Sequence, residues 1–278
     1  MISLFTLLFV GFLIGTCGTL IGAGGGFILV PLLIISTHHS MPPNIITAVS
    51  IAVVAANAIS GSIAYAAAGR IDYKAGLTFG LFTIPGSILG VLLIKYVPLH
   101  LFNILFGILL TGLATFLFIN NGRSEEAKTV LANMPAGTKY RLLTDSKGEQ
   151  FSYTYNQTYG IIVSVLVGFL SPILGIGGGI IHVPAMVNWL QFPVYIATAT
   201  SHFTLAIMST VSVIMHIFEG NYSNPQVLHM VIGLCIGVVP GAQAGAYLSH
   251  KIHTKIIVGV MALCLGFVGI RILMMALL

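Results

Sequence analysis

The sequence predicts an all-α integral membrane protein with two homologous halves of about four hydrophobic segments each, in which the glycine-rich helices are broken or re-entrant. Of its 278 residues, 57% are hydrophobic and 6% are charged, whereas about a quarter of the residues of a soluble domain carry charge. In addition, one glycine-proline signature occurs twice. The first copy consists of Gly15, Gly22, Gly24, Gly25, Gly26 and Pro31, and the second, 153 positions later, of Gly168, Gly175, Gly177, Gly178, Gly179 and Pro184.

Each half is expected to contain four apolar segments. Along the chain they cover about residues 4–36, 45–68, 75–97, 99–119, 159–190, 194–218, 227–249 and 254–278. Because a helix of about 20 residues spans a bilayer, six of them are expected to be ordinary membrane helices. The first and the fifth are longer and have a glycine cluster near the middle. Since glycine costs about 1 kcal/mol in a helix interior relative to alanine, we expect each to form two half-helices joined by extended backbone, or a re-entrant hairpin beside a shorter helix.

The duplication divides the chain into three parts. Residues 1–119 are predicted to form the first membrane repeat and residues 159–278 the second. Residues 120–158 lie outside the duplication and predict a polar linker outside the membrane, with a small hairpin that turns at Asp145 to Gly148. Four complete crossings per half would make the repeats parallel, whereas three crossings plus a re-entrant hairpin would invert them. The short basic connections between the third and fourth segments of both halves favour equivalent placement. Arg70, Lys74 and the basic residues of the linker argue against it, because they lie on the opposite side if all eight segments cross, so membrane orientation stays open.

The two glycine segments also carry a family resemblance. GFLIGTCGTLIGAGGGFILVP begins at Gly11 and returns in weaker form as GFLSPILGIGGGIIHVP, which begins at Gly168. This doubled pattern and the duplicated layout resemble the TauE/SafE family of membrane transporters, over nearly the whole chain. The resemblance implies a secondary transporter in the cell (inner or plasma) membrane that exports a small sulfur-containing anion, such as sulfite or an organosulfonate. We expect it to work by alternating access between the two repeats.

The glycine clusters are the predicted centre of a substrate site. A small anion that enters a membrane must exchange its water shell for hydrogen-bond donors, and exposed backbone N–H groups at a helix N-terminus supply them. Hydroxyl and amide side chains add donors without a buried charge. Packing of small residues is the alternative explanation for the glycines, and packing or capping for the hydroxyls. The candidate substrate-binding residues are Gly24, Gly25, Gly26, Gly177, Gly178, Gly179, Ser50, Ser201, Thr47, Thr198 and Asn57.

Three of the histidines of the second half lie within the fifth and sixth apolar segments, at positions 182, 202 and 216. Histidine titrates near neutral pH and is therefore able to couple proton movement to anion movement. His202 adjoins Ser201 in the duplicated Thr-Ala-x-Ser motif, and we take it as the proton-coupling candidate. A structural role as a hydrogen-bond partner is the alternative for all three. No Asp or Glu lies deep in a predicted span, so a carboxylate-based proton or cation pathway has little support.

Other classes of function find less support in the sequence. An intramembrane enzyme needs a nucleophile with a base, paired acids or a metal cluster, and no such motif is present. Cys17, Cys235 and Cys264 have neither paired nor metal-ligand spacing. We therefore expect no catalytic residues, no metal and no cofactor. The expected partners are the anionic substrate and the lipid bilayer, without nucleic acid, and a homo-oligomer is compatible with the sequence. An anion channel, or a transporter of an unrelated small organic anion, is the alternative function.

Overall fold

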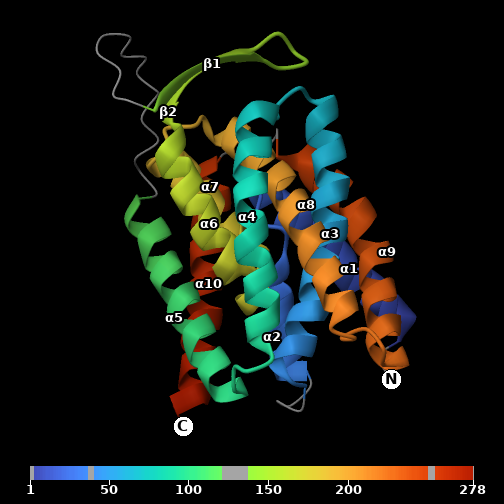
Figure 1. Ribbon diagram of the computed structural model, residues 1–278. Helices are drawn as coiled ribbons and strands as arrows, with labels where there is room; N and C mark the ends of the chain where they lie inside the picture. Colours follow the sequence, from blue (N-terminus) through green and yellow to red (C-terminus); the bar gives the residue numbers. More distant parts are fainter. Residues whose placement is uncertain (1–2, 37–40, 121–136, 250–253, 278) are drawn as a thin grey trace.

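The computed structural model describes residues 3–36, 41–120, 137–249 and 254–277. It is a bundle of helices with a two-stranded hairpin across one end, which we call the hairpin end (Figure 1). α1 begins and α10 ends at the opposite end (Figure 1). The helices are α1 (Leu4–Ile21), α2 (Gly26–Ser36), α3 (Pro43–Ala67), α4 (Tyr73–Ile94), α5 (Leu99–Asn120), α6 (Gln157–Leu174), α7 (Gly179–Asn188), α8 (Val194–Phe218), α9 (Pro225–Leu248) and α10 (Thr254–Leu277), and the strands are β1 (Thr138–Thr144) and β2 (Gln150–Asn156).

The first glycine cluster breaks its segment and reverses the chain. α1 ends at Gly22, whose φ is 79°, and the next turn contains Gly24 at 79° and Gly25 at 85°. These left-handed values favour glycine over every other residue. A Cβ atom on Gly25 would lie 2.9 Å from the carbonyl oxygen of Ile14, so the chain has folded back along α1. The prediction of a broken segment is confirmed, and α1 and α2 form a re-entrant hairpin.

The second glycine cluster repeats this geometry. Gly175, Gly177 and Gly178 have φ values of 69°, 81° and 68°. A Cβ atom on Gly178 would lie 2.7 Å from Cγ1 of Val167, so α7 likewise returns along α6. The two glycine clusters, which are 153 residues apart in the sequence, therefore share their backbone conformation and their type of contact as well as their residue types.

The two sets of helices enter the bundle from opposite ends. The α1–α2 hairpin opens at the end opposite the strands, and the α6–α7 hairpin opens at the hairpin end (Figure 1). Contacts between the sets occur in corresponding pairs: α1 packs on α9 as α4 packs on α6, and α3 packs on both α9 and α8 as α8 packs on both α4 and α3. Of the two arrangements left open by the sequence, the helices adopt the inverted one. The homology of the halves and the boundaries at residues 119 and 159 stay predictions.

Glycines let helices of the two sets approach closely. A Cβ atom on Gly15 of α1 would lie 2.5 Å from the carbonyl oxygen of Val238 in α9. On the other side of the bundle, a Cβ atom on Gly86 of α4 would lie 2.7 Å from the backbone nitrogen of Phe169 in α6. Real side chains do not tolerate such distances, so part of the glycine content serves packing, as small residues do in membrane bundles.

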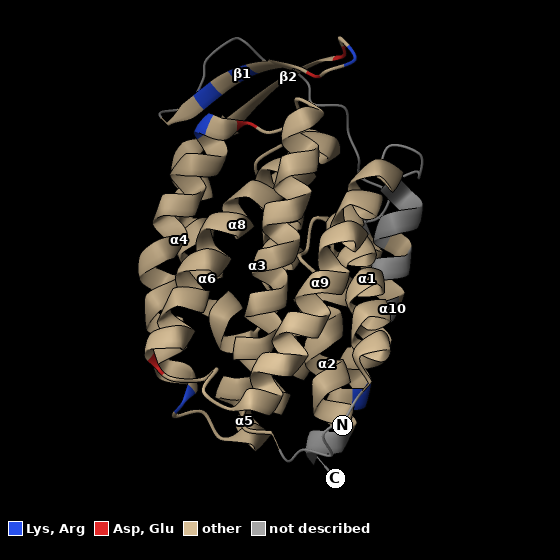
Figure 2. Ribbon diagram, turned by 90° about the vertical axis from the view of Figure 1, so that its right-hand side faces the viewer, with Lys and Arg blue, Asp and Glu red and all other residues tan. Residues whose placement is uncertain are grey.

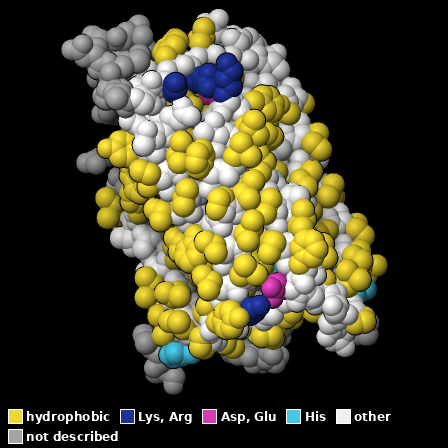
Figure 3. Space-filling model, in the orientation of Figure 1, with side chains coloured by type: hydrophobic (Ala, Val, Ile, Leu, Met, Phe, Trp, Pro, Cys, Tyr) yellow, Lys and Arg dark blue, Asp and Glu magenta, His cyan; other side chains and the backbone are white. Residues whose placement is uncertain are grey.

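The outer surface is that of a multi-pass membrane protein. Seven helices of the described residues are long and apolar enough to cross a bilayer. On the face shown in Figure 3, hydrophobic side chains cover the middle and charged side chains lie near the two ends. The ribbon in Figure 2 shows the same distribution, with Lys and Arg concentrated on the strands and the adjoining helix end. A belt of exposed apolar side chains between polar ends matches a hydrocarbon layer between two aqueous phases.

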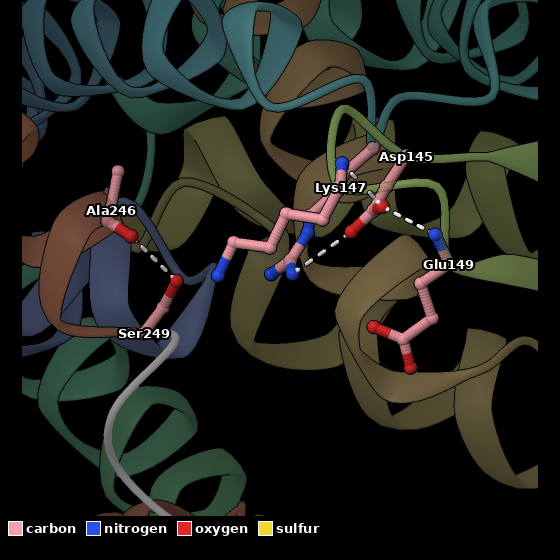
Figure 4. Close-up of polar contacts among 6 residues, drawn as sticks. Asp145, Lys147, Glu149, Ala246 and Ser249 are labelled. Carbon is pink, nitrogen blue, oxygen red and sulfur yellow. Dashed lines mark hydrogen bonds and ion pairs between the residues drawn. The ribbon is translucent and has the colours of Figure 1, made fainter.

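The predicted hairpin turn at Asp145 to Gly148 is confirmed. The Gly148 amide donates to the carbonyl of Asp145, and Gly148 has a φ of 82°. The Asp145 carboxylate accepts from the amides of Lys147 and Glu149 at 2.9 Å each, and pairs with the Arg70 guanidinium at 3.3 Å (Figure 4). Burial opposes the charged form of Asp145, but these donors together hold the pKa of its carboxyl below its usual value.

A second acidic residue attaches the hairpin to α4. Asp72 caps α4 by accepting from the Ala75 amide at 3.0 Å. It also accepts from the Tyr153 hydroxyl at 2.8 Å and forms an ion pair with Arg141 at 3.1 Å. Burial, and then the neighbouring Asp72 carboxylate, raise the pKa of Tyr153. The part of the expected linker that the structure describes is thus fastened to the helix bundle, while residues 121–136 lie outside the described residues.

Candidate functional site

The two glycine turns meet in the interior of the bundle. A Cβ atom on Gly24 would lie 3.0 Å from Cγ1 of Val54, and one on Gly177 would lie 2.6 Å from the same atom. Gly26 and Gly179 each lie against a backbone carbonyl of the opposite turn. The six glycines proposed from the sequence are therefore brought together at one place, although each glycine of the first cluster is 153 positions from its counterpart in the second. Whether they bind substrate stays a prediction.

Each turn leaves backbone donors without acceptors. The N–H groups of Gly25 and Gly178, which precede α2 and α7, find no acceptor among the described residues. The carbonyl oxygens of the same two glycines accept from the first turn of the helix that follows. An unpaired N–H at a helix N-terminus is a ready donor for an anion, since the helix dipole favours negative charge there.

A small cavity lies beside the second turn. Its volume is about 10 Å³, enough for roughly one water molecule. Ser201 lines this cavity, is fully buried, and its hydroxyl has no hydrogen-bond partner among the described residues. None of the lining side chains carries a formal charge at neutral pH in its ordinary form. The lining residues are Thr83, Val167, Gly177, Gly178, Gly179, His182, Ser201, Thr204, Leu205 and Met208.

The other three predicted hydroxyl residues, Ser50, Thr47 and Thr198, have other contacts. Ser50 donates to the carbonyl oxygen of Gly175 at 2.5 Å, and Thr47 donates to the carbonyl of Asn44 within α3 at 3.1 Å. Thr198 packs its methyl group against Gly22. Of the four predicted hydroxyl ligands, Ser201 is thus the one placed on the cavity with its oxygen unpaired. The other three lie close to the turns and support them.

Asn57 and His202 belong to a buried network around Thr19 on α1. The Thr19 hydroxyl donates to Oδ1 of Asn57 at 2.8 Å and lies 3.3 Å from Nε2 of His202. The backbone carbonyl of Thr19 accepts from the Tyr65 hydroxyl at 2.8 Å, and the Tyr65 and His202 rings meet edge to face. The structure therefore brings together the two predicted residues, Asn57 and His202, on the α1 side of the centre. The Nδ2 atom of Asn57 remains unpaired there.

Sequence reasoning missed several polar residues at this centre. Thr19 lies within the first glycine segment, and its position between two glycines gave no sign of its bonds to Asn57 and His202. Thr204 follows Ser201 by three residues, so helical spacing places both on one face of α8. That spacing was available in the sequence. Thr83, by contrast, reaches the cavity from α4 through tertiary packing alone.

The other two histidines occupy separate environments. His182 lies on the first turn of α7, lines the cavity, and has Nε2 3.3 Å from the Ser164 hydroxyl. His216 accepts at Nδ1 from the Asn221 side chain at 2.8 Å, near the opposite end. Within the described residues no three His, Cys, Asp or Glu side chains lie together as a metal site would require. The side chain of Cys264 lies outside the described residues.

Comparison with known proteins agrees with this architecture. Residues 7–272 match the family described as Sulfite exporter TauE/SafE. The chain is 32% identical over 276 residues to the probable membrane transporter protein YunE of Bacillus subtilis, which covers 98% of this chain and 97% of the relative. It is 27% identical to a probable membrane transporter protein of Methanocaldococcus jannaschii, covering 96% and 94% of the two chains. No solved structure matches the chain. Since the family match spans nearly its whole length, the protein is a membrane transporter rather than an enzyme, and it belongs to the sulfite exporter TauE/SafE family.

Proposed function

We propose that the protein is a secondary transporter of the cell membrane that exports a small sulfur-containing anion, such as sulfite or an organosulfonate. The observation that carries the proposal is a small cavity with unpaired donors beside the second glycine turn, where that turn lies against the first. Gly178 offers a backbone N–H, and Ser201 offers a hydroxyl. The cavity lining holds no carboxylate that would repel an anion. Donors without a fixed counter-charge suit an anion that must be released again.

The position of this site between two inverted sets of helices supports a mechanism of alternating access. The cavity is about 10 Å³ in volume, so it has room for roughly one water molecule and must widen to hold an anion of several heavy atoms. In this mechanism the cavity widens when α6 and α7 move relative to α4 and α8, whose residues also line it. Because α1 and α9 stand in the corresponding relation to the first turn, the same movement in the other half would open the other end.

The test is counterflow of labelled sulfite in liposomes that contain the purified protein. A carrier exchanges external label for internal unlabelled anion with saturable kinetics, whereas a channel gives a conductance far above carrier turnover. Protein-free liposomes measure leakage through the lipid. The expected result is saturable counterflow that is lost in Gly178→Leu and kept in Gly112→Ala, since a Cβ atom on Gly112 meets nothing within 4 Å. Absence of counterflow with sulfite, thiosulfate and short organosulfonates would contradict the proposal.

A further inference from the structure

The hydrogen bonds around His182 define which of its ring nitrogens carries a proton. The Ser164 hydroxyl lies 2.7 Å from the carbonyl oxygen of Gly160 and 3.3 Å from Nε2 of His182. A carbonyl oxygen only accepts, so Ser164 uses its one proton on Gly160. Towards His182 the hydroxyl is therefore an acceptor. Consequently Nε2 of the neutral ring bears the hydrogen, and Nδ1 presents a lone pair.

That lone pair has no partner among the described residues, although His182 is 2% exposed. The histidine lines the cavity together with Ser201 and with the glycines that precede α7. Ser201 and the Gly178 amide offer hydrogen atoms, whereas Nδ1 of His182 offers an acceptor. A fully deprotonated oxyanion would leave that acceptor unpaired. An oxyanion that still carries one proton pairs with both kinds of group.

Nδ1 of His182 is the most basic side-chain atom among the described residues that line the cavity. From α4, Phe79 meets the ring edge to face at 5.7 Å, and from α6 the contact is Ser164. α8 contributes hydroxyl and apolar side chains to the same cavity. Tyr155 of β2 packs on Phe79, ring to ring at 6.0 Å, and beyond it lie Tyr153, Asp72 and Arg141. No Asp, Glu, Lys or Arg is among the described residues that line the cavity.

His202 and His216, like His182, each have one ring nitrogen without a partner among the described residues, Nδ1 and Nε2 respectively, so the difference lies in their location. The Thr19 hydroxyl donates its proton to Asn57, so it accepts from Nε2 of His202. For His216, Nδ1 accepts from Nδ2 of Asn221, whose Oδ1 accepts from Asn44. Neither histidine lines the cavity beside the second turn. His182 is the histidine that faces the space proposed for the anion.

We propose that His182 takes up the proton of the transported anion, so that the site carries a small oxyanion together with one proton. The inference rests on the proposed function of this same site. A hydrogen oxyanion such as hydrogen sulfite places its O–H against Nδ1. The proton either stays on the anion or moves to Nδ1, which leaves an imidazolium beside a doubly charged anion. Atoms and total charge are the same in both forms, and release of the anion with its proton restores the neutral ring.

The experiment measures sulfite and protons in the same liposomes, with a pH-sensitive dye inside. Wild-type protein is expected to move one proton with each sulfite and to accumulate sulfite against its gradient when a pH difference is imposed. His182→Gln is expected to show slower counterflow at equal pH, with loss of both proton movement and pH-driven accumulation. His216→Gln is the matched control, a buried histidine outside the cavity, and is expected to keep all three. Melting temperatures of the purified variants verify folding.

Each other result has a defined meaning. Sulfite movement without protons in the wild type, or pH-driven accumulation that survives in His182→Gln, overturns the inference. Loss of coupling in His202→Gln but not in His182→Gln also overturns it, because the proton would then use the Thr19 network. Complete loss of counterflow in folded His182→Gln counts against it too, since the residue would then be required for anion binding in general. Absence of wild-type counterflow would instead mark failure of the proposed function.

Discussion

Ser50 donates its hydroxyl hydrogen to the carbonyl oxygen of Gly175 at 2.5 Å, whereas Ser201, the matching residue of the other half, has no hydrogen-bond partner among the described residues. The two serines occupy matching positions in the duplicated Thr-Ala-x-Ser motif and are both fully buried. One of them holds the second glycine turn in place. The other leaves its donor available at the cavity. At these two positions the two sets of helices are therefore alike in backbone and unlike in hydrogen bonding.

Alanine substitutions of these two serines should affect different properties, namely stability at position 50 and transport at position 201. Ser50→Ala leaves the buried Gly175 carbonyl without its donor and should lower the free energy of unfolding by about 1–3 kcal/mol. Ser201→Ala removes an unpaired hydroxyl, so its melting temperature should stay near that of the wild type while sulfite counterflow falls several-fold. Thermal melting and counterflow of both variants check this. Equal melting temperatures for the two, or full transport by Ser201→Ala, would refute the distinction.

The glycine turns should tolerate no side chain. Gly25→Leu and Gly178→Leu should insert into the membrane and lose transport, because the new side chain at position 25 collides with Ile14 of α1, and that at position 178 collides with Val167 and Met208, which line the cavity. Gly25→Ala and Gly178→Ala should be milder yet harmful, since φ is 85° and 68° at these positions. The measurement is counterflow normalised to the amount of inserted protein.

Two control glycines separate crowding from backbone strain. Gly148 has a φ of 82° with nothing within 4 Å of an added Cβ atom, so Gly148→Ala introduces backbone strain without a steric clash. Gly112→Ala introduces neither backbone strain nor a steric clash, and it should stabilise its helix by about 0.5–1 kcal/mol. Both controls should transport normally. Wild-type transport by Gly178→Leu would show that the turns serve packing alone.

Thr19 should be essential for the network that holds His202. Thr19→Val keeps the shape of the side chain but leaves Oδ1 of Asn57 and Nε2 of His202 without the partner they share. Burial of these unpaired groups should lower the free energy of unfolding by about 1–3 kcal/mol. Chemical or thermal unfolding in detergent measures the loss. Thr16→Val is a suitable control, because Thr16 donates only to the carbonyl of Phe12 within its own helix, and it should change stability little.

The attachment of the hairpin should weaken in acid. Its donors hold the pKa of Asp145 below the usual value of 3.8, so the charged carboxylate stabilises the fold fully above that value. The contribution disappears as the pH falls below 3.8 through the folded-state pKa. Asp145→Asn should lower the melting temperature at neutral pH and show a shallower fall between pH 6 and pH 3. A parallel acid profile for variant and wild type would show that the Arg70–Asp145 pair does not contribute.

Much of the fold could be predicted because backbone geometry has a direct signature in the sequence. Three adjacent glycines in a long apolar segment predicted a broken helix, and the left-handed φ values at Gly24 and Gly25 supply its physical reason. The hairpin turn at Asp145 to Gly148 followed from turn chemistry in the same way. The direction of the chain after each glycine cluster was not predictable. A fold-back of α2 along α1 depends on contacts such as that between Gly25 and Ile14.

The polar centre was predictable only in part. Duplication singled out Ser50 and Ser201 as a pair, but the difference between them depends on the Gly175 carbonyl, 125 residues from Ser50. His202 drew attention by adjoining Ser201. Successive residues of a helix point in different directions, however, and the ring of His202 turns towards Thr19 instead of the cavity. Partners of this kind come from tertiary packing and leave no local signal in the sequence.

The most direct test of the central claim is anion binding to the purified protein, measured by thermal shift with sulfite, sulfate, thiosulfate and short organosulfonates. A ligand that binds only the folded state stabilises it by about 2.7 kcal/mol at one hundred times its dissociation constant. We predict that at least one sulfur oxyanion raises the melting temperature of the wild type and of Gly112→Ala, and leaves that of Gly178→Leu unchanged. No shift with any of these anions, or the same shift in Gly178→Leu as in the wild type, would contradict an anion site at the glycine turns.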